Sequence, residues 1–439
     1  MSLKKCMSLS AVIFILIIVF NLTGCSPRVT PEPPPVLSPA EPRQTVLFEP
    51  GDFQDPAICG ACHTEIYQAW SGSKHASSWV GELFQPDFQQ ALAETDGAVG
   101  ALCGECHAPV AFRTGQLPPF DGSEFDEISQ RGISCDFCHT VSEVTEKFNT
   151  GNVSSPGPVK RGPRGDTVSP MHETMYSQLH TEAEFCGACH NVRHPESGVL
   201  IIDTYDDWLA GPYAAEGITC QDCHMTPGPG VGKNPGRSSI AGNAKEREHI
   251  ATHYFVGGSS WQLSRMGSEE HARKAEENLR AAARLDLAGK LTADGLDLTV
   301  NVTNVGAGHK IPTGVTYIRQ MWLEVTVVNE KGDTVFRSGY TDAENNVDQN
   351  AVFFRRLFRD KEGNATNKSW LAQEIGFDRR IPPRGTETET YSIQAAGKTF
   401  TATVRLLYRS ISQAAVNAHS PGQGLLVPSV EMAKAEIKF

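Results

Sequence analysis

The chain has 439 residues and a formal net charge of −12, and 39% of its residues are hydrophobic. This length allows two domains besides terminal segments. An acidic chain is not expected to bind nucleic acid, since a phosphate backbone attracts a basic surface.

The first residues predict export from the cytoplasm. Lys4 and Lys5 precede an unbroken apolar run over 11–20, which is too short to cross a bilayer as a stable helix. The sequence LTGC over 22–25 resembles the lipobox of bacterial lipoproteins. We therefore expect residues 1–24 to be a lipoprotein signal peptide and Cys25 to be lipidated, with plain secretory cleavage as the alternative. Ser26 follows in place of aspartate, and the resemblance then implies an outer-membrane lipoprotein that faces the periplasm or the cell surface.

Residues 25–50 predict an extended tether. Eight prolines lie between 27 and 50, and apolar residues are sparse. Such a composition favours polyproline conformations and cannot build a core. We expect this segment to hold the folded part of the chain away from a lipid surface.

Five copies of the motif Cys-x-x-Cys-His follow. Their cysteines are Cys59 and Cys62, Cys103 and Cys106, Cys135 and Cys138, Cys186 and Cys189, and Cys220 and Cys223. The histidines that complete them are His63, His107, His139, His190 and His224. Each copy is the attachment signature of a c-type haem: the thiols form thioethers with the vinyl groups, and the histidine is the proximal ligand of the iron. A zinc site or a disulfide-rich domain would not place histidine after every second cysteine. The sequence therefore predicts five covalently attached haem c groups.

Residues 51–267 predict a pentahaem cytochrome domain that is mainly helical or irregular. Apolar periodicity is weak there, so we expect short helices, each carrying a motif, packed around apolar haem faces. The motif pair that starts at Cys103 and Cys135 is spaced by 32 residues, and the pair at Cys186 and Cys220 by 34. This internal repeat suggests two two-haem modules and one leading haem.

The distal ligands must come from outside the motifs. We expect them to be His75, His172, His180, His253 and His309. His75 follows a short predicted helix over 65–71. His172 and His180 are eight residues apart in a predicted helix from Pro170, so they would share a face and serve two irons, or one would bind a propionate.

Other side chains stay open as distal ligands. The methionine alternatives are Met171, Met175, Met225, Met266 and Met321, and the weaker histidine candidates are His194 and His249. His271, beside two glutamates, is expected to be solvated. His419 is expected to be structural.

The last part of the chain alternates in hydropathy. After a helical connector over 268–284, residues 285–439 predict an all-β sandwich of immunoglobulin type. The expected strands are 296–302, 321–328, 334–338, 389–393, 401–408 and 430–437. The loop over 306–314 presents His309 between glycines, and Pro312 stiffens it.

Specific motifs carry a family resemblance. They are the first motif with Tyr67, Trp70, Ser73 and His75 at fixed spacing, the sequence from Phe185 to His190, and the sequence from Cys220 to Met225. In these the chain resembles bacterial multihaem c-type cytochromes whose haem domain is similar to the tetrahaem cytochrome c-554 of ammonia oxidisers. Related chains from metal- and sulfur-reducing bacteria end in a β-domain with a Gly-His-x-x-Pro-Thr-Gly loop. The resemblance implies a respiratory or extracellular electron-transfer chain.

Two function classes compete. One is an electron-transfer protein without catalytic residues, whose partners are other cytochromes or a quinol oxidoreductase and whose lipid anchor binds the membrane. The other is a reductase of nitrite, hydroxylamine or a sulfur oxyanion with one open haem. Pentahaem nitrite reductases usually have lysine in place of one motif histidine, whereas all five motifs here keep histidine. We therefore expect a carrier of electrons rather than an enzyme.

Overall fold

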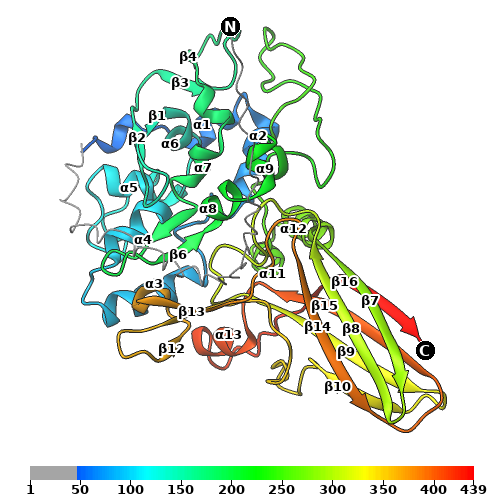
Figure 1. Cartoon of the computed structure of the whole chain (residues 1–439). Coiled ribbons are helices and arrows are strands. Elements are labelled where there is room, and N and C mark those ends of the chain that lie inside the picture. The colour runs from blue at the N-terminus through cyan, green and yellow to red at the C-terminus, as the bar shows by residue number, and fades with distance from the viewer. Residues whose placement is uncertain (1–46) are drawn as a thin grey trace, which may run out of the picture. The chain divides into compact units, whose positions relative to one another are not determined.

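The computed structural model describes residues 47–439, all of which belong to one compact unit (Figure 1). The predicted signal peptide, Cys25 and most of the tether lie outside the described residues. Within 47–439, no helix combines the length and the hydropathy needed to span a membrane.

Short helices dominate the part that carries the motifs. They are α1 (Pro56–Gly60), α2 (Thr64–Ser71), α3 (Phe84–Glu94), α4 (Gly100–His107), α5 (Pro109–Arg113), α6 (Cys135–Thr140), α7 (Ala183–Gly187), α8 (Thr204–Leu209), α9 (Pro212–Ala215), α10 (Gln221–His224) and α11 (Ser260–Arg265). Local signals start several of them: Asp55 accepts a hydrogen bond from the Ala57 N–H at 2.7 Å, and Pro56 occupies the first position of α1. Every motif lies on such a helix or at its end.

Small strands and 3₁₀ turns connect these helices. The strands form three two-stranded sheets: β1 (Val141–Val144) with β2 (Asn152–Ser154), β3 (Val159–Gly162) with β4 (Glu173–Tyr176), and β5 (Asn191–Arg193) with β6 (Leu200–Asp203). The 3₁₀ turns are Pro50–Asp52, Ser129–Arg131, Gln178–Thr181 and, later in the chain, Ser369–Leu371.

The predicted helix from Pro170 is wrong, because its backbone bonds elsewhere. Residues Glu173–Tyr176 form β4, which pairs in parallel with β3. The Ser169 hydroxyl accepts hydrogen bonds from the N–H groups of Met171 and His172 at 3.1 and 3.4 Å. No helix follows this hydroxyl cap because residues 173–176 pair with β3, so His172 and His180 do not share a helical face.

Strands of the C-terminal part form two larger sheets. One has the order β10 (Thr334–Ser338), β9 (Gln320–Asn329), β15 (Phe400–Arg409), β16 (Val430–Lys438), and the other has the order β14 (Thr386–Gln394), β8 (Gly295–Asn304), β7 (Ala283–Thr292). All neighbours are antiparallel. Each of the six predicted strands is present, and β7 is an additional one.

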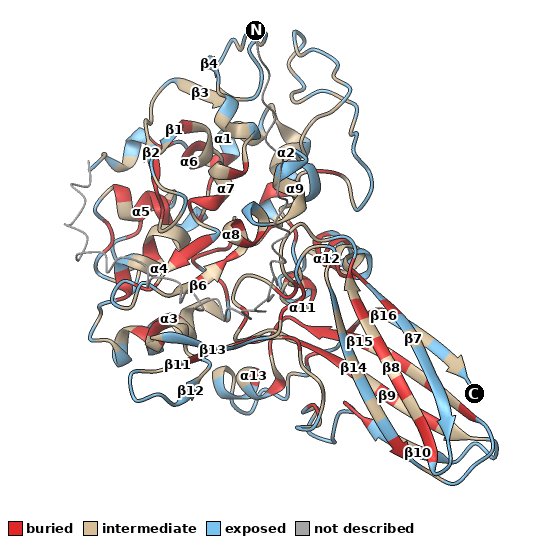
Figure 2. Ribbon diagram, viewed as in Figure 1, coloured by how far each residue is buried: buried red, intermediate tan, exposed pale blue. Residues whose placement is uncertain are grey.

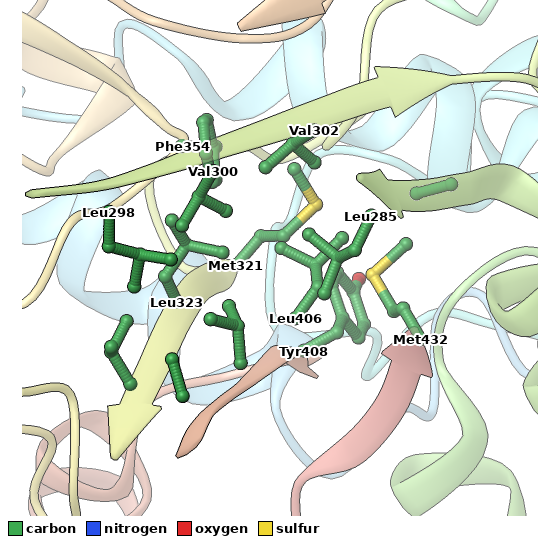
Figure 3. Close-up of a cluster of buried hydrophobic side chains, with 14 of the residues drawn as sticks. Leu285, Leu298, Val300, Val302, Met321, Leu323, Phe354, Leu406, Tyr408 and Met432 are labelled. Atoms are coloured by element: carbon green, nitrogen blue, oxygen red, sulfur yellow. The ribbon is translucent and has the colours of Figure 1, made fainter. Parts of the chain in front are cut away.

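A single core lies between these sheets. Leu298, Val300 and Val302 of β8 pack with Met321 and Leu323 of β9, together with residues of β7, β15 and β16 (Figure 3). Buried and partly buried residues alternate along β8 and the first part of β15, as the hydropathy pattern predicts (Figure 2). The two sheets therefore form a sandwich.

A third sheet interrupts the sandwich sequence. It has the order β12 (Ala365–Thr366), β11 (Arg356–Arg359), β13 (Glu374–Asp378), and helix α13 (Gln413–His419) follows β15. Phe358 of β11 packs with Val192 and Ile201 of the motif-bearing part. This insertion therefore contacts the helical part rather than the sandwich core.

Helix α12 (Glu269–Ala282) leads directly into β7. His271, expected to be solvated, is only 5% exposed, and its Nε2 is 2.6 Å from the Ala69 carbonyl oxygen. The expectation was wrong because the face of α12 that carries His271 packs against α2. Gly72, at the end of α2, leaves space for the ring, since a Cβ on Gly72 would lie 2.4 Å from the His271 ring.

Candidate haem centres

The motif glycines allow close packing beside the haem-attaching cysteines. In the first, second and fourth motifs, glycine follows the first cysteine. A Cβ on Gly60 would lie 2.6 Å from the Tyr67 ring, and one on Gly187 would lie 2.6 Å from the Tyr205 ring. A larger residue would displace these aromatic rings from the attachment helix.

Backbone carbonyls orient the motif histidines. The Nδ1 atoms of His63, His107, His139 and His224 lie 2.6 to 2.9 Å from the carbonyl oxygens of Ser238, Ser78, Arg161 and Val256, respectively. An Nδ1–H bond to a carbonyl fixes the tautomer and leaves Nε2 for a metal. Among the described residues, no group hydrogen-bonds to Nε2 of these four histidines.

Four motif histidines face a second histidine ring. The ring centroids are 6.4 Å apart in His63–His172, 6.1 Å in His75–His190, 6.4 Å in His139–His253 and 6.3 Å in His224–His309. Two imidazoles on one iron, each with a bond of about 2 Å, have centroids roughly 6 Å apart. The spacing therefore fits an iron between each pair. These are the residues that would hold the first, fourth, third and fifth haem, respectively.

Backbone carbonyls also orient three of the four histidines that face a motif histidine. The Nδ1 atoms of His172, His253 and His309 lie 3.0, 3.0 and 2.9 Å from the carbonyl oxygens of Glu173, Ala251 and Lys310. Burial lowers the pKa of His75 and His253 to about 3 and that of His309 to about 4. Iron binds the neutral ring, so burial keeps these side chains in the binding form.

His180 differs from the prediction. Its Nε2 lies 3.1 Å from the Cys138 carbonyl oxygen, and its Nδ1 lies 2.9 Å from the Ser177 hydroxyl. Both nitrogens thus have protein partners, although the ring stacks 5.5 Å from that of His139. The structure places it beside the third centre rather than opposite a motif histidine.

The other histidine candidates are also bonded to protein. His194 Nε2 lies 2.9 Å from the Trp370 carbonyl oxygen, and His249 Nδ1 accepts from the Asn234 N–H at 3.2 Å. His419 forms a bond of 2.7 Å to Asp87. The structural role expected for His419 agrees with this contact.

The second centre is different. Among residues 47–439, no histidine ring faces His107; instead the Phe84 ring lies parallel to it at a centroid distance of 3.7 Å. Phe84 belongs to an aromatic cluster with Trp79 and Phe88. The spacing of residues along the sequence did not predict that Phe84 lies beside His107.

A tyrosine from the C-terminal part also belongs to the surroundings of the second centre. Burial raises the pKa of Tyr317, and the charges of Asp87 and Cys103 add to this effect. Tyr317 also packs in one cluster with Leu102, which precedes the motif cysteine. It follows the His309 loop, where sequence analysis looked only for a histidine.

Thiols of different motifs contact one another. The side chains of Cys59 and Cys135, of Cys106 and Cys189, and of Cys186 and Cys220 are near neighbours. The first motif thus meets the third, and the fourth meets both the second and the fifth. The fourth and fifth motifs are neighbours, as the repeat suggests, whereas the second contacts the fourth through these thiols.

Three comparisons relate this chain to known haem proteins. The family model of cytochrome c554 and c-prime matches residues 58–140. The cytochrome c nitrite reductase subunit NrfA of Nitratidesulfovibrio vulgaris is 24% identical over 188 residues, which are 39% of this chain and 34% of that protein. The crystal structure of a penta-heme cytochrome c552 from Thermochromatium tepidum has a TM-score of 0.62 and 21% identity, and the match covers 89% of this chain and 100% of that one.

The motifs, the facing histidine rings and the shared fold define a class of protein that binds several haems through cysteine and histidine. The chain is similar to multihaem c-type cytochromes in its motifs and in its fold. Haem c is the cofactor that its motif residues fit.

Proposed function

We propose that this protein relays electrons along five covalently bound haems. The observation that carries the proposal is the set of four facing histidine pairs at 6.1 to 6.4 Å. Bound haem supplies reversible one-electron chemistry, and two histidine ligands leave the iron no open position for a substrate. The thiol contacts between motifs support close spacing of the centres.

A second function is favoured by one specific observation. No described histidine faces His107, and Phe84 stacks on its ring. We propose as the alternative that the second centre keeps an open position and reduces a small substrate such as nitrite, hydroxylamine or a sulfur oxyanion. Four histidine-paired centres would then deliver electrons to it.

An electron paramagnetic resonance spectrum of the oxidised protein tests both functions. A pure relay predicts five low-spin centres, with a side chain other than histidine on the second iron. A reductase predicts four low-spin centres and one high-spin centre that binds added cyanide. Two or more high-spin centres would contradict both proposals, because the facing histidines would then not be ligands.

We also propose export as an outer-membrane lipoprotein anchored through Cys25, with redox proteins as partners. The LTGC sequence and the proline-rich segment after it support this proposal. Labelled palmitate should be incorporated into the wild-type protein, and Cys25→Ala should abolish labelling and release a soluble form. Protease treatment of intact cells then separates the periplasmic face from the cell surface. An unlabelled wild-type protein would indicate secretion without lipidation.

We further propose that the C-terminal sandwich is of immunoglobulin type. In chain order, its strands β7, β8 and β14 share one sheet, and β9, β10, β15 and β16 share the other. In immunoglobulin folds the second and fifth strands pair in one sheet, and the third, sixth and seventh strands are neighbours in the other. Here β8 pairs with β14 in one sheet, and β9, β15 and β16 are neighbours in the other. An experimental structure of the holoprotein tests the topology.

A further inference from the structure

The loop that carries His309 is attached to a second segment of the C-terminal part. His309 lies between β8 and β9, and its carbonyl oxygen accepts a hydrogen bond from Asn304 Nδ2 at 2.9 Å. Ile311 exchanges backbone hydrogen bonds with Ile381 at 3.0 and 2.9 Å. The position of His309 therefore depends on where the segment around Ile381 lies.

Arg380, directly before Ile381, is fully buried and bonds to the motif-bearing part. Its guanidinium donates to both carboxylate oxygens of Asp203 and to Asp207 Oδ2, each at 2.9 Å. It also donates to Asp378 Oδ2 at 2.8 Å. Asp203 ends β6 and Asp207 lies in α8, between the fourth and the fifth motif.

Two further cations complete a buried ion cluster. Lys310, the neighbour of His309, places Nζ 3.1 Å from Asp207 Oδ1, and Arg356 bonds to Asp203 and Asp378. The buried ion cluster thus consists of Asp203, Asp207, Asp378, Lys310, Arg356 and Arg380. Three carboxylates face three cations, so its charges balance in this arrangement. Buried charges are costly when a partner is missing, so this set of contacts favours one placement of the loop.

We propose that the buried ion cluster positions His309 opposite His224, and that Arg380 is its main positioning residue. The bonds of Asn304 and Ile311 fix the shape of the loop, but they lie within the C-terminal part. Besides a bond of 2.8 Å between the hydroxyls of Thr313 and Thr204, the contacts to Asp203 and Asp207 relate the loop to the chain segment that leads to the fifth motif, and they are the charged and buried ones. The inference goes beyond electron transfer and depends on His309 as an axial ligand.

A matched control exists nearby. Arg384 forms two hydrogen bonds to Glu216, at 2.6 and 2.7 Å, and also joins the C-terminal part to the segment before the fifth motif. Both side chains are more than two-fifths exposed, at 49% and 42%. An exposed pair contributes little, and this one makes no contact with Lys310 or His309. Arg384→Gln therefore removes a link between the same segments without disturbing the buried ion cluster.

The test is Arg380→Gln in the mature holoprotein, read by electron paramagnetic resonance. We expect one low-spin centre to become high-spin, the same change that His309→Ala produces. Added imidazole should restore the low-spin signal in both variants. Arg384→Gln should keep the wild-type spectrum, and the mass of each variant should show unchanged haem content.

Several outcomes would overturn the proposal. One is a wild-type spectrum in folded Arg380→Gln, and another is an equal loss in Arg384→Gln. An unchanged spectrum in His309→Ala would remove the axial ligand itself and the proposal with it. If Arg380→Gln does not accumulate, the partly exposed Lys310 and its partner are tested as Lys310→Met and Asp207→Asn. A raised high-spin fraction in either supports the proposal, and wild-type spectra in both contradict it.

Discussion

A histidine of this chain is available to a metal only when its Nε2 has no protein partner. His253 and His309 satisfy this condition because a backbone carbonyl near each ring binds Nδ1. His180 and His271 do not, since their Nε2 atoms lie 3.1 and 2.6 Å from carbonyl oxygens. The role of each ring thus follows from which nitrogen the backbone binds.

At this scale we predict opposite results for two histidines beside the third motif. His253→Ala removes the ring opposite His139, so one centre should change from low-spin to high-spin. His180→Ala should keep all spin states and cost about 0.5–1.5 kcal/mol of stability for each bond lost, to the Cys138 carbonyl and the Ser177 hydroxyl. Magnetic circular dichroism and thermal unfolding measure both. The reverse result, with the spin change in His180→Ala, would exchange the two assignments.

The ionisation of Asp378 should make the stability of the fold depend on pH. Burial raises its pKa, but hydrogen bonds and charges of Arg380 and Arg356 outweigh this and lower the pKa to about 2. Because this value lies below the unfolded value of about 3.9, ionised Asp378 stabilises the fold. The contribution, about 2 kcal/mol, is complete above about pH 4 and is lost as the pH falls through about 2. Thermal unfolding of Asp378→Asn should therefore vary less between pH 5 and pH 3 than that of the wild type. Equal variation in both would contradict the role of this carboxylate.

At the scale of the element, the attachment helices depend on small residues. Helix α7 places Gly187 against Tyr205, and the residues around Gly60 and Tyr67 repeat this contact in the first motif. Gly60 and Gly187 are thus required by packing between the motif and an aromatic ring that follows it, whereas Gly104 of the second motif faces the Leu117 side chain. The third motif has Asp136 at this position, and there the side chain binds Lys160 instead.

Gly187→Ala should therefore lower stability and haem content at the fourth motif. Its Cβ would lie 2.6 Å from the Tyr205 ring, so the ring or the helix must move. Substitutions that overpack a site cost about 1–3 kcal/mol. Gly217→Ala is not a suitable control, because Gly217 has a φ of 73°. Gly51→Ala is suitable, since no atom lies within 4 Å of its Cβ. Equal haem content and melting temperature in both variants would show that the Tyr205 ring can move aside without loss of stability.

Sequence patterns predicted some elements well and others poorly, for physical reasons. The strands of the sandwich have one buried face, so their alternation is visible, and β10 has the predicted bounds Thr334–Ser338. Strands β11 to β13 are short and pack on the helical part, so no period marks them. Likewise, spacing indicated His75, His172, His253 and His309, but it could not show that the Cys138 carbonyl binds His180.

At the scale of the whole chain, the two parts differ in how they bury apolar surface. The sandwich has one continuous core with buried residues from six strands. The motif-bearing part has several separate small clusters, such as those around Phe88, Phe137 and Val256. Haem faces are the additional apolar surface that would unite these clusters. The fold of this part should therefore require haem attachment.

Expression without a haem-attachment system tests this difference. We expect the motif-bearing part to be digested rapidly by protease, while a fragment that begins near β7 persists and keeps a β-type circular dichroism spectrum. Holoprotein under the same conditions should resist cleavage over its whole folded length. An intact, protease-resistant chain without haem would show that the small clusters suffice.

The contacts between cysteine side chains also determine which motifs are neighbours. The fourth motif contacts the second through Cys189 and Cys106, and the fifth through Cys186 and Cys220. The side chain of Cys138 also lies near that of Cys189, so the third motif adjoins the fourth. The fourth motif is therefore the one that connects the others. Without it, the first and third motifs would still be neighbours, but the second and the fifth would each have no neighbouring motif. In the proposed relay, electrons that move between any two of these three branches would pass through the fourth centre.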